Sequence, residues 1–388
     1  MGQWLFRLIR DRENVADPAV RQRYGVLGSV VGILCNVLLF LAKLMIGTWT
    51  SSIAITADAF NNLSDVGSAV ITLMGFRLSS RPADQKHPFG YGRFEYIGGL
   101  AVAFIILLLG VELLRSSVDR ILHPEAVAFS YVAVAVLALS ILVKWWMGVF
   151  NGAIGKKIGS AAMKATSLDS LCDVAATGAT LLSLLLARFA GLTVDGYMGL
   201  VVAGFVFYAG IKIARDTISP LLGQQPDPAM VEQLKERILR GVGVVGVHDL
   251  VVHDYGPGRV LASAHVEVSA KGDLLACHDS IDMIEREIIG QMGVQITLHM
   301  DPIVLDDPEV NRLRQLVARA VTDLDPHMSV HDFRATVGPS HKNLIFDVVA
   351  PYSVRLTDKE VSDRLNAAVR AQEPNSFCVI SVDRGYVG

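Results

Sequence analysis

The feature that most constrains this chain is a series of long apolar stretches in its first 220 residues. A helix needs about 20 mostly apolar residues to cross a bilayer. Hydrophobic residues make up 52% of the chain and charged residues only 19%, a composition typical of membrane proteins. The sequence therefore predicts a bundle of six transmembrane helices, at residues 26–48, 52–77, 97–121, 127–150, 161–188 and 193–220.

The segments between these stretches differ in their basic residues. The segment before the first stretch, the 78–96 loop and the 151–164 stretch contain several Arg or Lys, whereas the turns at 47–51 and 190–193 contain none. Loops rich in Lys and Arg stay on the cytosolic side of a membrane. We therefore expect both termini in the cytosol and the protein in a bacterial-type plasma membrane.

The composition changes after about residue 222, where charged residues and histidines reach the density of a soluble domain. The net charge of -3 offers no basic field for nucleic acid. An amphipathic helix from Asp227 precedes strands at 250–253 and 260–268, a helix at 275–292 and a strand at 295–300. This pattern predicts an α+β domain of the ferredoxin-like, βαββ class.

The same pattern recurs at a near-constant offset. Asp307-Pro308 repeats Asp227-Pro228, and His331-Asp332 repeats His248-Asp249. We therefore predict a tandem duplication of the small domain. The expected domains are a cytosolic segment at 1–24, a transmembrane domain at 25–222, a metal-binding and dimerisation domain at 223–302, and a second domain at 303–388.

Five polar residues of two predicted spans are spaced in an informative way. Asp58, Asn61 and Asp65 lie in the second, and Asp169 and Asp173 in the fifth. An ionised carboxylate in a bilayer costs several kcal/mol unless something compensates it. Asn61 and Asp65 are four residues apart, as are Asp169 and Asp173, so each pair lies on one helix face. Small residues flank both pairs and allow close helix contact, which predicts a cation site of Asn61, Asp65, Asp169 and Asp173.

Three stretches resemble the cation diffusion facilitator family. They are A-D-A-F-N-N-L-S-D at 57–65, R-P-A-D-Q-K-H-P-F-G-Y-G at 81–92 and S-L-D-S-L-C-D at 167–173, and V-H-D-L at 247–250 adds a fourth. The resemblance covers about residues 20–302. It implies a homodimeric exporter in the lipid bilayer that moves a divalent metal out of the cytosol in exchange for protons.

The metal is inferred from the donor atoms. Zinc carriers of this family usually place a histidine in one of the two pairs, and this chain has none there. An all-oxygen set suits harder ions, so we expect Mn²⁺ as cargo, as in the manganese-type members that the chain resembles. Zn²⁺ and Fe²⁺ remain alternatives because oxygen sites bind them too. Carboxylates left empty repel one another and take up protons, which predicts metal–proton antiport by alternating access.

Three further positions are open to more than one interpretation. Asp58, one turn from Asn61, is either an additional partner of the cargo site or a helix cap. In the first basic loop, Asp84 and His87 match a second metal position of the family, but Tyr91 replaces its next histidine. A turn cap beside a surface histidine is the alternative for that loop.

The cytosolic domain carries a larger group of matched positions, at which the family places ligands of a metal cluster at its dimer interface. They are His248, His265, His278, His299 and Asp301. Imidazole and carboxylate ligands suit zinc-like ions, which would either regulate transport or only strengthen the dimer. In the second domain Ser381 stands where His299 would be, so we expect that domain to be metal-free.

One other class of function competes with a carrier, a metal sensor that the helices merely anchor. The acids within the spans argue against it, because an anchor gains nothing from their cost. An enzyme is not expected, since the sequence lacks a nucleophile, base and orienting group at workable spacing.

Overall fold

The computed structural model describes residues 5–9, 18–49, 53–123, 129–192, 194–338 and 341–384. Much of the expected segment 1–24, and the expected span ends at 52, 127 and 193, lie outside these residues. The chain forms two compact units. The helical unit comprises the chain up to Gln224 together with Tyr255–Arg259, and the mixed unit comprises the rest.

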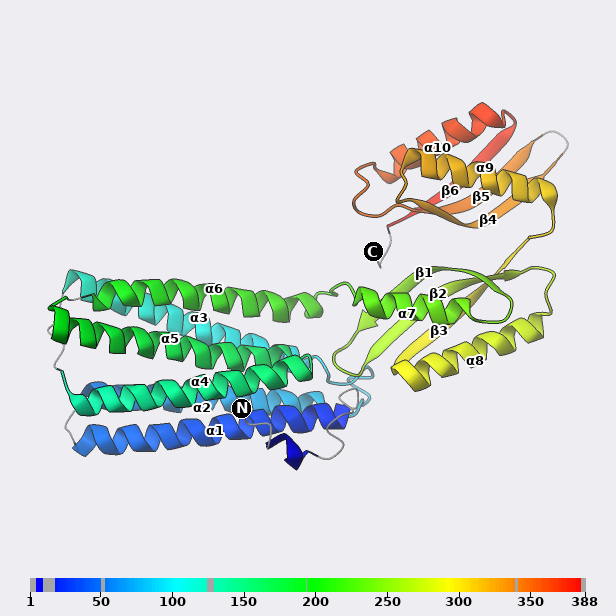
Figure 1. Cartoon of the computed structure of the whole chain (residues 1–388). Coiled ribbons are helices and arrows are strands. Elements are labelled where there is room, and N and C mark those ends of the chain that lie inside the picture. Colours follow the sequence, from blue (N-terminus) through cyan, green and yellow to red (C-terminus); the bar gives the residue numbers. More distant parts are fainter. Residues whose placement is uncertain are drawn as a thin grey trace. The chain divides into compact units, whose positions relative to one another are not determined.

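The helical unit contains a short 3₁₀ helix (Leu5–Leu8) and six long helices that run side by side (Figure 1). Ser130 and Ser160 cap the N-termini of two of them by accepting backbone N–H bonds. Gly191 ends the helix that Ser160 begins, in the left-handed conformation that glycine adopts without strain. The long helices are α1 (Pro18–Trp49), α2 (Ile53–Ser79), α3 (Phe94–Leu122), α4 (Tyr131–Lys157), α5 (Ala161–Ala190) and α6 (Asp195–Leu221).

Among the described residues, five of these helices are long and apolar enough to cross a membrane: α1, α3, α4, α5 and α6. Helix α2 has 27 residues but is not among them. Its first half carries Asp58, Asn61, Asn62 and Asp65, which lower its hydropathy. The polar residues of the predicted cargo site thus make α2 less apolar than the other five long helices. A membrane crossing by α2 stays a prediction.

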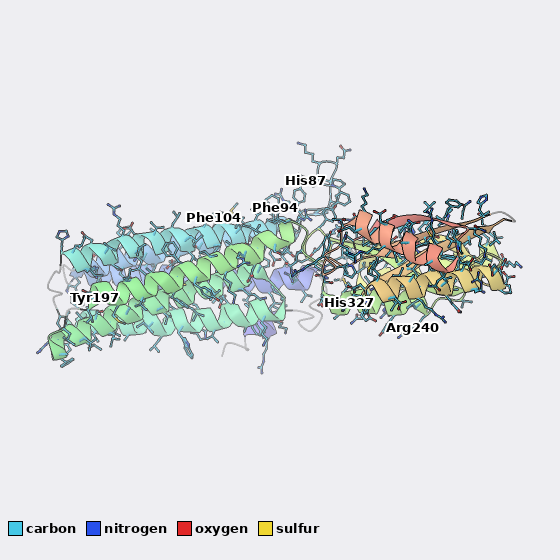
Figure 2. All side chains as sticks on the ribbon, turned by 90° about the horizontal axis from the view of Figure 1, so that it is seen from above. His87, Phe94, Phe104, Tyr197, Arg240 and His327 are labelled. Carbon is cyan, nitrogen blue, oxygen red and sulfur yellow. The ribbon has the colours of Figure 1, made fainter. Side chains whose placement is uncertain are left out.

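The helical unit exposes many large apolar side chains and buries several polar ones. Phe104 and Tyr197 are exposed on its surface (Figure 2), whereas Thr72, Lys144 and Ser170 are buried. This arrangement suits a lipid bilayer, in which apolar side chains need not be buried inside the protein.

The first half of the mixed unit, here called the first repeat, has the order αββαβ. Strands β1 and β2 pair antiparallel, and β2 pairs parallel with β3. Asp227 and Asp273 cap the two helices. The elements are α7 (Pro228–Leu239), β1 (Val244–Asp254), β2 (Val260–Ser269), α8 (Leu274–Met292) and β3 (Val294–Ile303).

The second repeat has the same order and the same strand pairings. Both repeats also share an irregularity after the first histidine of the first strand, where Asp249 (φ 50°) and Asp332 (φ 49°) adopt a left-handed backbone. Each sheet has three strands, and a helix precedes them. The order αββαβ agrees with the elements expected from Asp227 onward and corrects the βαββ label of their class. The elements are α9 (Pro308–Leu324), β4 (Ser329–Val337), β5 (Lys342–Val349), α10 (Asp358–Gln372) and β6 (Ser376–Asp383).

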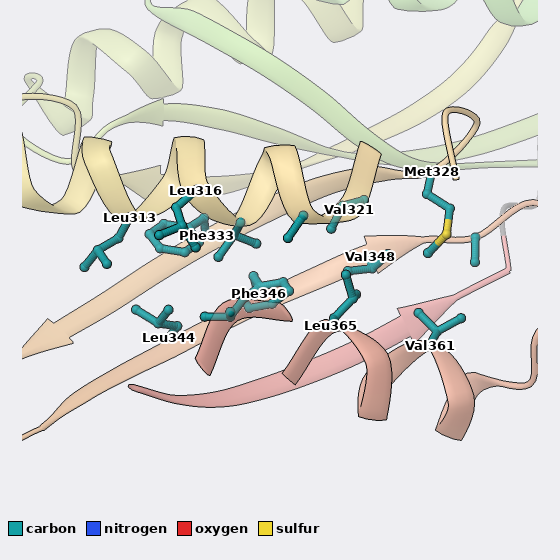
Figure 3. Close-up of a cluster of buried hydrophobic side chains, with 14 of the residues drawn as sticks. Leu313, Leu316, Val321, Met328, Phe333, Leu344, Phe346, Val348, Val361 and Leu365 are labelled. Carbon is teal, nitrogen blue, oxygen red and sulfur yellow. The ribbon is translucent and has the colours of Figure 1, made fainter. Parts of the chain in front are cut away.

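Each repeat has its own hydrophobic core, formed by its two helices against one face of its sheet. In the second repeat, Leu313 of α9, Phe346 of β5 and Leu365 of α10 meet in the centre (Figure 3), and each is at most 1% exposed. Strand alternation leaves the other side chains of these strands free for polar contacts.

Candidate metal sites

The first candidate site lies between α2 and α5. The hydroxyl oxygens of Thr72 and Thr166 are 3.2 Å apart and join the two helices. Asp65 precedes Thr72 by seven residues and Asp173 follows Thr166 by seven. Because the helices run in opposite directions, both carboxylates lie about 10 Å along the axis from that contact. Asp169 lies one turn nearer to it and is 5% exposed.

A buried lysine of α4 occupies the space between these carboxylates. The Lys144 Nζ atom is 2.5 Å from Asp65 Oδ2 and 2.6 Å from Asp173 Oδ2. The Lys144 side chain is 4% exposed, so its charge depends on these partners. Asp65, Asp169, Asp173 and Lys144 together carry a formal charge of -2 when all are ionised.

Lys144 is a residue of this site that was not predicted, although the sequence carries a signal for it. It is the one charged residue in the apolar stretch that it interrupts, 131–155. An ionisable residue inside a span marks a functional position by default and needs a partner of opposite charge.

A second buried ion pair lies in the helical unit. The Lys43 Nζ atom of α1 is 2.8 Å from Asp58 Oδ2 of α2, and the Lys43 side chain is 3% exposed. Asp58 lies within α2 rather than at its start, so its side chain pairs with Lys43 instead of capping the helix.

Asn61 is an exposed residue of α2, and the Lys144 ion pairs involve Asp65 and Asp173. The neighbouring Asn62 is 3% exposed, and its amide nitrogen finds no hydrogen-bond partner among the described residues. The role of Asn61 as a ligand stays a prediction.

The loop candidate is an exposed turn. The Asp84 carboxylate accepts backbone N–H bonds from Lys86 (2.9 Å) and His87 (2.8 Å), and the Tyr91 hydroxyl donates to it at 2.7 Å. The Tyr91 bond and the backbone bonds hold the pKa of the Asp84 carboxyl below its ordinary value. His87 Nδ1 is 3.7 Å from this carboxylate, and its side chain is 52% exposed (Figure 2). These contacts match the turn-cap interpretation.

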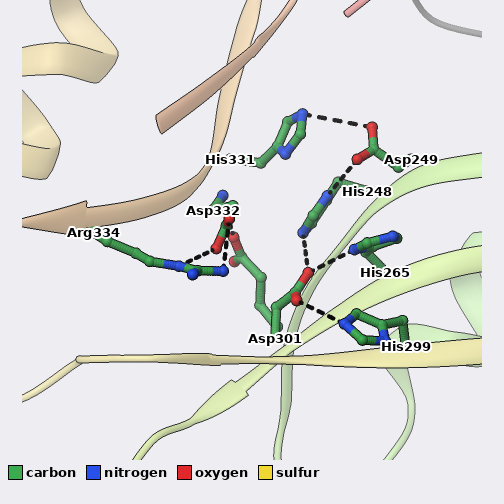
Figure 4. A network of polar contacts seen from close by, with 9 residues as sticks. His248, Asp249, His265, His299, Asp301, His331, Asp332 and Arg334 are labelled. Atoms are coloured by element: carbon green, nitrogen blue, oxygen red, sulfur yellow. Dashed lines mark hydrogen bonds and ion pairs between the residues drawn. The ribbon is translucent and has the colours of Figure 1, made fainter. Parts of the chain in front are cut away.

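The cytosolic candidate is a group of three imidazoles around one carboxylate in the first repeat (Figure 4). Asp301 of β3 is 5% exposed. Its carboxylate is 3.2 Å from His248 Nε2, 2.8 Å from His265 Nδ1 and 3.6 Å from His299 Nε2. Strand register causes this convergence, because His265 pairs with both His248 and His299 across the sheet.

Two overlapping sets at this group have ligand atoms close enough to hold a metal. One consists of His248, the adjacent Asp249 and His265, and the other of His265, His299 and Asp301. His278 lies on α8 and is in neither set. Burial opposes a charge on His248, but its bond to Asp249 and the nearby carboxylates of Glu267 and Asp301 raise its pKa overall. The carboxylates around His248 therefore favour a positive charge at its ring.

Acidic residues of the second repeat lie close to this metal-ligand group of the first repeat. Burial, followed by the nearby carboxylates of Asp383, Asp332 and Asp249, raises the pKa of Asp347. The Glu267 carboxylate of the first repeat accepts a bond of 3.2 Å from the Asp332 N–H of the second.

Comparison with known proteins covers both units. Residues 29–222 match the profile described as the cation efflux transmembrane domain. Residues 226–303 match the profile described as the cation efflux protein cytoplasmic domain, whose short name, ZT_dimer, marks it as a dimerisation domain. Both matches end before α9 of the second repeat.

Individual relatives are similar over most of their own length. The chain is 31% identical to an uncharacterized transporter of Methanocaldococcus jannaschii over 250 residues, which cover 64% of this chain and 88% of the relative. It is 25% identical to the cation-efflux pump FieF of Salmonella paratyphi A and of Salmonella agona over 287 residues, which cover 73% of this chain and 95% of each relative.

Proposed function

The chain belongs to the cation efflux, or cation diffusion facilitator, family, and on that premise we propose that it exports Mn²⁺ from the cytosol in exchange for protons. As a member it is a cation efflux transporter, a multi-pass membrane protein with a cytoplasmic C-terminal domain, and not an enzyme. The cargo, the coupling to protons and the residues of the site are the proposal.

The observation that carries this proposal is the position of Lys144. Its ammonium group lies between Asp65 and Asp173, so these two carboxylates already hold a cation inside the helical unit. The buried Asp169 is one turn from Asp173 on the same helix and offers a third carboxylate. We assign these three carboxylates to the cargo site. Asn61 is assigned as a fourth oxygen donor, which joins the site when the carrier changes conformation.

Lys144 gives the site a built-in competitor for the metal. A divalent ion that binds Asp65 and Asp173 must displace the ammonium group, because both cations need the same oxygen atoms. When the metal leaves, Lys144 returns to these carboxylates and keeps them from standing unpaired in a low dielectric. Protonation of Asp169, the third carboxylate, then competes with rebinding of the metal.

The preference for Mn²⁺ rests on the donor atoms. All three assigned acids present oxygen, and oxygen donors suit Mn²⁺ better than the nitrogen and sulfur donors that zinc favours. The buried Cys172 lies next to Asp173 in sequence but packs within a hydrophobic cluster of the unit. The second candidate is the same carrier with Zn²⁺ or Fe²⁺ as its cargo.

We further propose that the carrier is a homodimer and that zinc-like ions in the cytoplasmic domain regulate it. The match to a dimerisation profile supports the first part. The group of His248, His265, His299 and Asp301 supports the second, because nitrogen and carboxylate donors suit zinc. His278, which lies on α8 outside this group, is the candidate ligand from the partner subunit.

The test is metal uptake into proteoliposomes of the full chain with Mn²⁺, Zn²⁺ and Fe²⁺ under an imposed pH gradient. The variants are Asp169→Ala and a matched control, Asp119→Asn, whose acid is 75% exposed at the end of α3. We expect Mn²⁺ uptake to need both the gradient and Asp169 and to be unchanged in the control. Equal Zn²⁺ uptake would refute the selectivity, and no uptake of any metal would favour a sensor.

A further inference from the structure

A second group of metal-ligand atoms lies where the two repeats of the mixed unit meet. It consists of Asp249 from β1, His331 from β4 and Asp383 from β6, with their ligand atoms within 4.8 Å of one another. We propose that this group is a divalent metal site that fastens the two cytosolic repeats to each other. It is separate from the cargo site and does not depend on the proposed transport activity.

His331 is the observation that points to a ligand. It is 8% exposed, and neither of its ring nitrogens has a hydrogen-bond partner among the described residues. One face of the ring stacks on His248, with centroids 4.1 Å apart. A buried polar group without a partner is costly, and an imidazole nitrogen that faces carboxylates is a common metal ligand.

The Asp249 carboxylate is placed to share such a metal. Its Oδ1 atom is 3.7 Å from His331 Nε2, too far for a hydrogen bond and a spacing that a bridging ion could fill (Figure 4). Its Oδ2 atom is 3.3 Å from His248 Nδ1. Asp249 therefore lies between the metal-ligand group of the first repeat and His331 of the second.

The strand register explains why the second repeat offers only part of a site. In the first repeat His248, His265 and His299 are cross-strand neighbours, and the corresponding residues of the second repeat are His331, Asp347 and Ser381. Asp383 likewise corresponds to Asp301. The second repeat thus keeps one imidazole and one carboxylate of the set, and Asp249 of the first repeat supplies another ligand. This shared site differs from the expectation that the second domain is metal-free.

The donor set defines the class of ligand. One imidazole and two carboxylates suit a first-row divalent ion such as Zn²⁺, and Asp347 adds negative charge nearby. A metal held by strands of both repeats stabilises their contact, because it binds only when they are together. The hydrogen bond from the Asp332 N–H to the Glu267 carboxylate is another polar contact between the two repeats.

The test counts zinc bound to the purified, metal-stripped full-length protein after equilibration with Zn²⁺ and desalting. The starting chain carries His265→Ala and His299→Ala, which remove the ligand group of the first repeat and leave Asp249, His331 and Asp383. To this chain His331→Ala, Asp383→Asn or His327→Ala is added. His327 is the matched control, a histidine of the second repeat that is 76% exposed (Figure 2).

We expect His331→Ala and Asp383→Asn each to lose one zinc per chain and His327→Ala to lose none. Hydrogen exchange should show that zinc protects β4 and β6 in the starting chain but not in the Asp383→Asn chain. Asp383→Asn preserves the shape of a half-buried side chain, so it carries the test if His331→Ala fails to fold. Equal zinc counts in all four chains, or an equal loss in the control, would overturn the proposal.

Discussion

The Lys144 ammonium group lies 2.5 Å from the Asp65 carboxylate in the interior of the helical unit, and the same group is 2.6 Å from Asp173. Three helices, α2, α4 and α5, therefore meet at one ion-pair group. A carrier needs a site that binds its cargo and also releases it, and a tethered cation that returns to the empty site favours release.

Replacing Lys144 with Gln removes this competitor. We predict that the apparent KM for the transported metal falls about tenfold, which corresponds to ~1.4 kcal/mol of tighter binding. The maximal rate should fall as well, because release slows. Initial uptake rates in proteoliposomes over a range of metal concentrations measure both.

The matched control for that experiment is Lys156→Gln, which removes an exposed lysine near the end of the same helix. Its KM and rate should equal those of the unaltered protein. An unchanged or higher KM in Lys144→Gln would show that the lysine does not compete with the metal.

The second repeat should unfold independently of the first, because each has its own core. Phe346→Ala removes a side chain that is 1% exposed at the centre of the second core. We predict a loss of about 3–5 kcal/mol in the free energy of unfolding of that repeat. Hydrogen exchange of the full chain should show faster exchange in α9, β5 and α10, with β2 and β3 unchanged.

Phe377→Ala is the control for this prediction, since Phe377 is 52% exposed on β6 of the same sheet. It should change exchange little. Loss of protection in both repeats after Phe346→Ala would instead mean that they unfold as one cooperative unit.

The parts of the structure that follow from local patterns could be predicted from the sequence. Helix length, the i, i+4 spacing of Asp169 and Asp173, and the alternation in β2 that turns His265 to one face are all set within a single element. The recurrence of His248-Asp249 as His331-Asp332 is likewise a local pattern, so the duplication could be predicted from the sequence.

The parts that depend on contacts between distant elements could not be predicted in this way. Lys144 meets Asp65 across 79 residues, and Lys43 meets Asp58 from another helix. No periodicity within α4 or α1 shows which neighbour its lysine faces. The position of Asp249 beside His331 likewise depends on how two separately folded repeats contact each other.

The stability of the second repeat should depend on pH through Glu309. Bonds from Arg312 and then Lys342 lower the pKa of its carboxyl to about 2, from an ordinary value of 4.5. A lowered pKa in the folded state means that the ionised group stabilises the fold. This contribution is complete above about pH 4.5 and is lost as the pH falls toward 2.

Hydrogen exchange of α9 at pH 5 and pH 3, corrected for the intrinsic effect of pH, tests this prediction. Protection should decrease at pH 3 in the unaltered chain and decrease less in Glu309→Gln, which has no proton to gain at that position. The exposed pairing is expected to be weak, and added salt should reduce it. An equal decrease in both chains would assign the pH dependence to other groups.

The Lys43–Asp58 pair makes a prediction about the helical unit that is separate from transport. Removing one member of a buried ion pair leaves an unpaired charge, at a cost of about 3–5 kcal/mol, whereas replacing both members with apolar residues is often neutral or stabilising. We therefore expect Asp58→Leu to lower the melting temperature of the purified protein strongly, because the Lys43 side chain is 3% exposed. Lys43→Leu should have a smaller effect, since the Asp58 side chain is 27% exposed and is partly solvated without its partner. The double variant should melt close to the unaltered protein, and a double variant no more stable than Asp58→Leu would show that the two charges do not depend on each other.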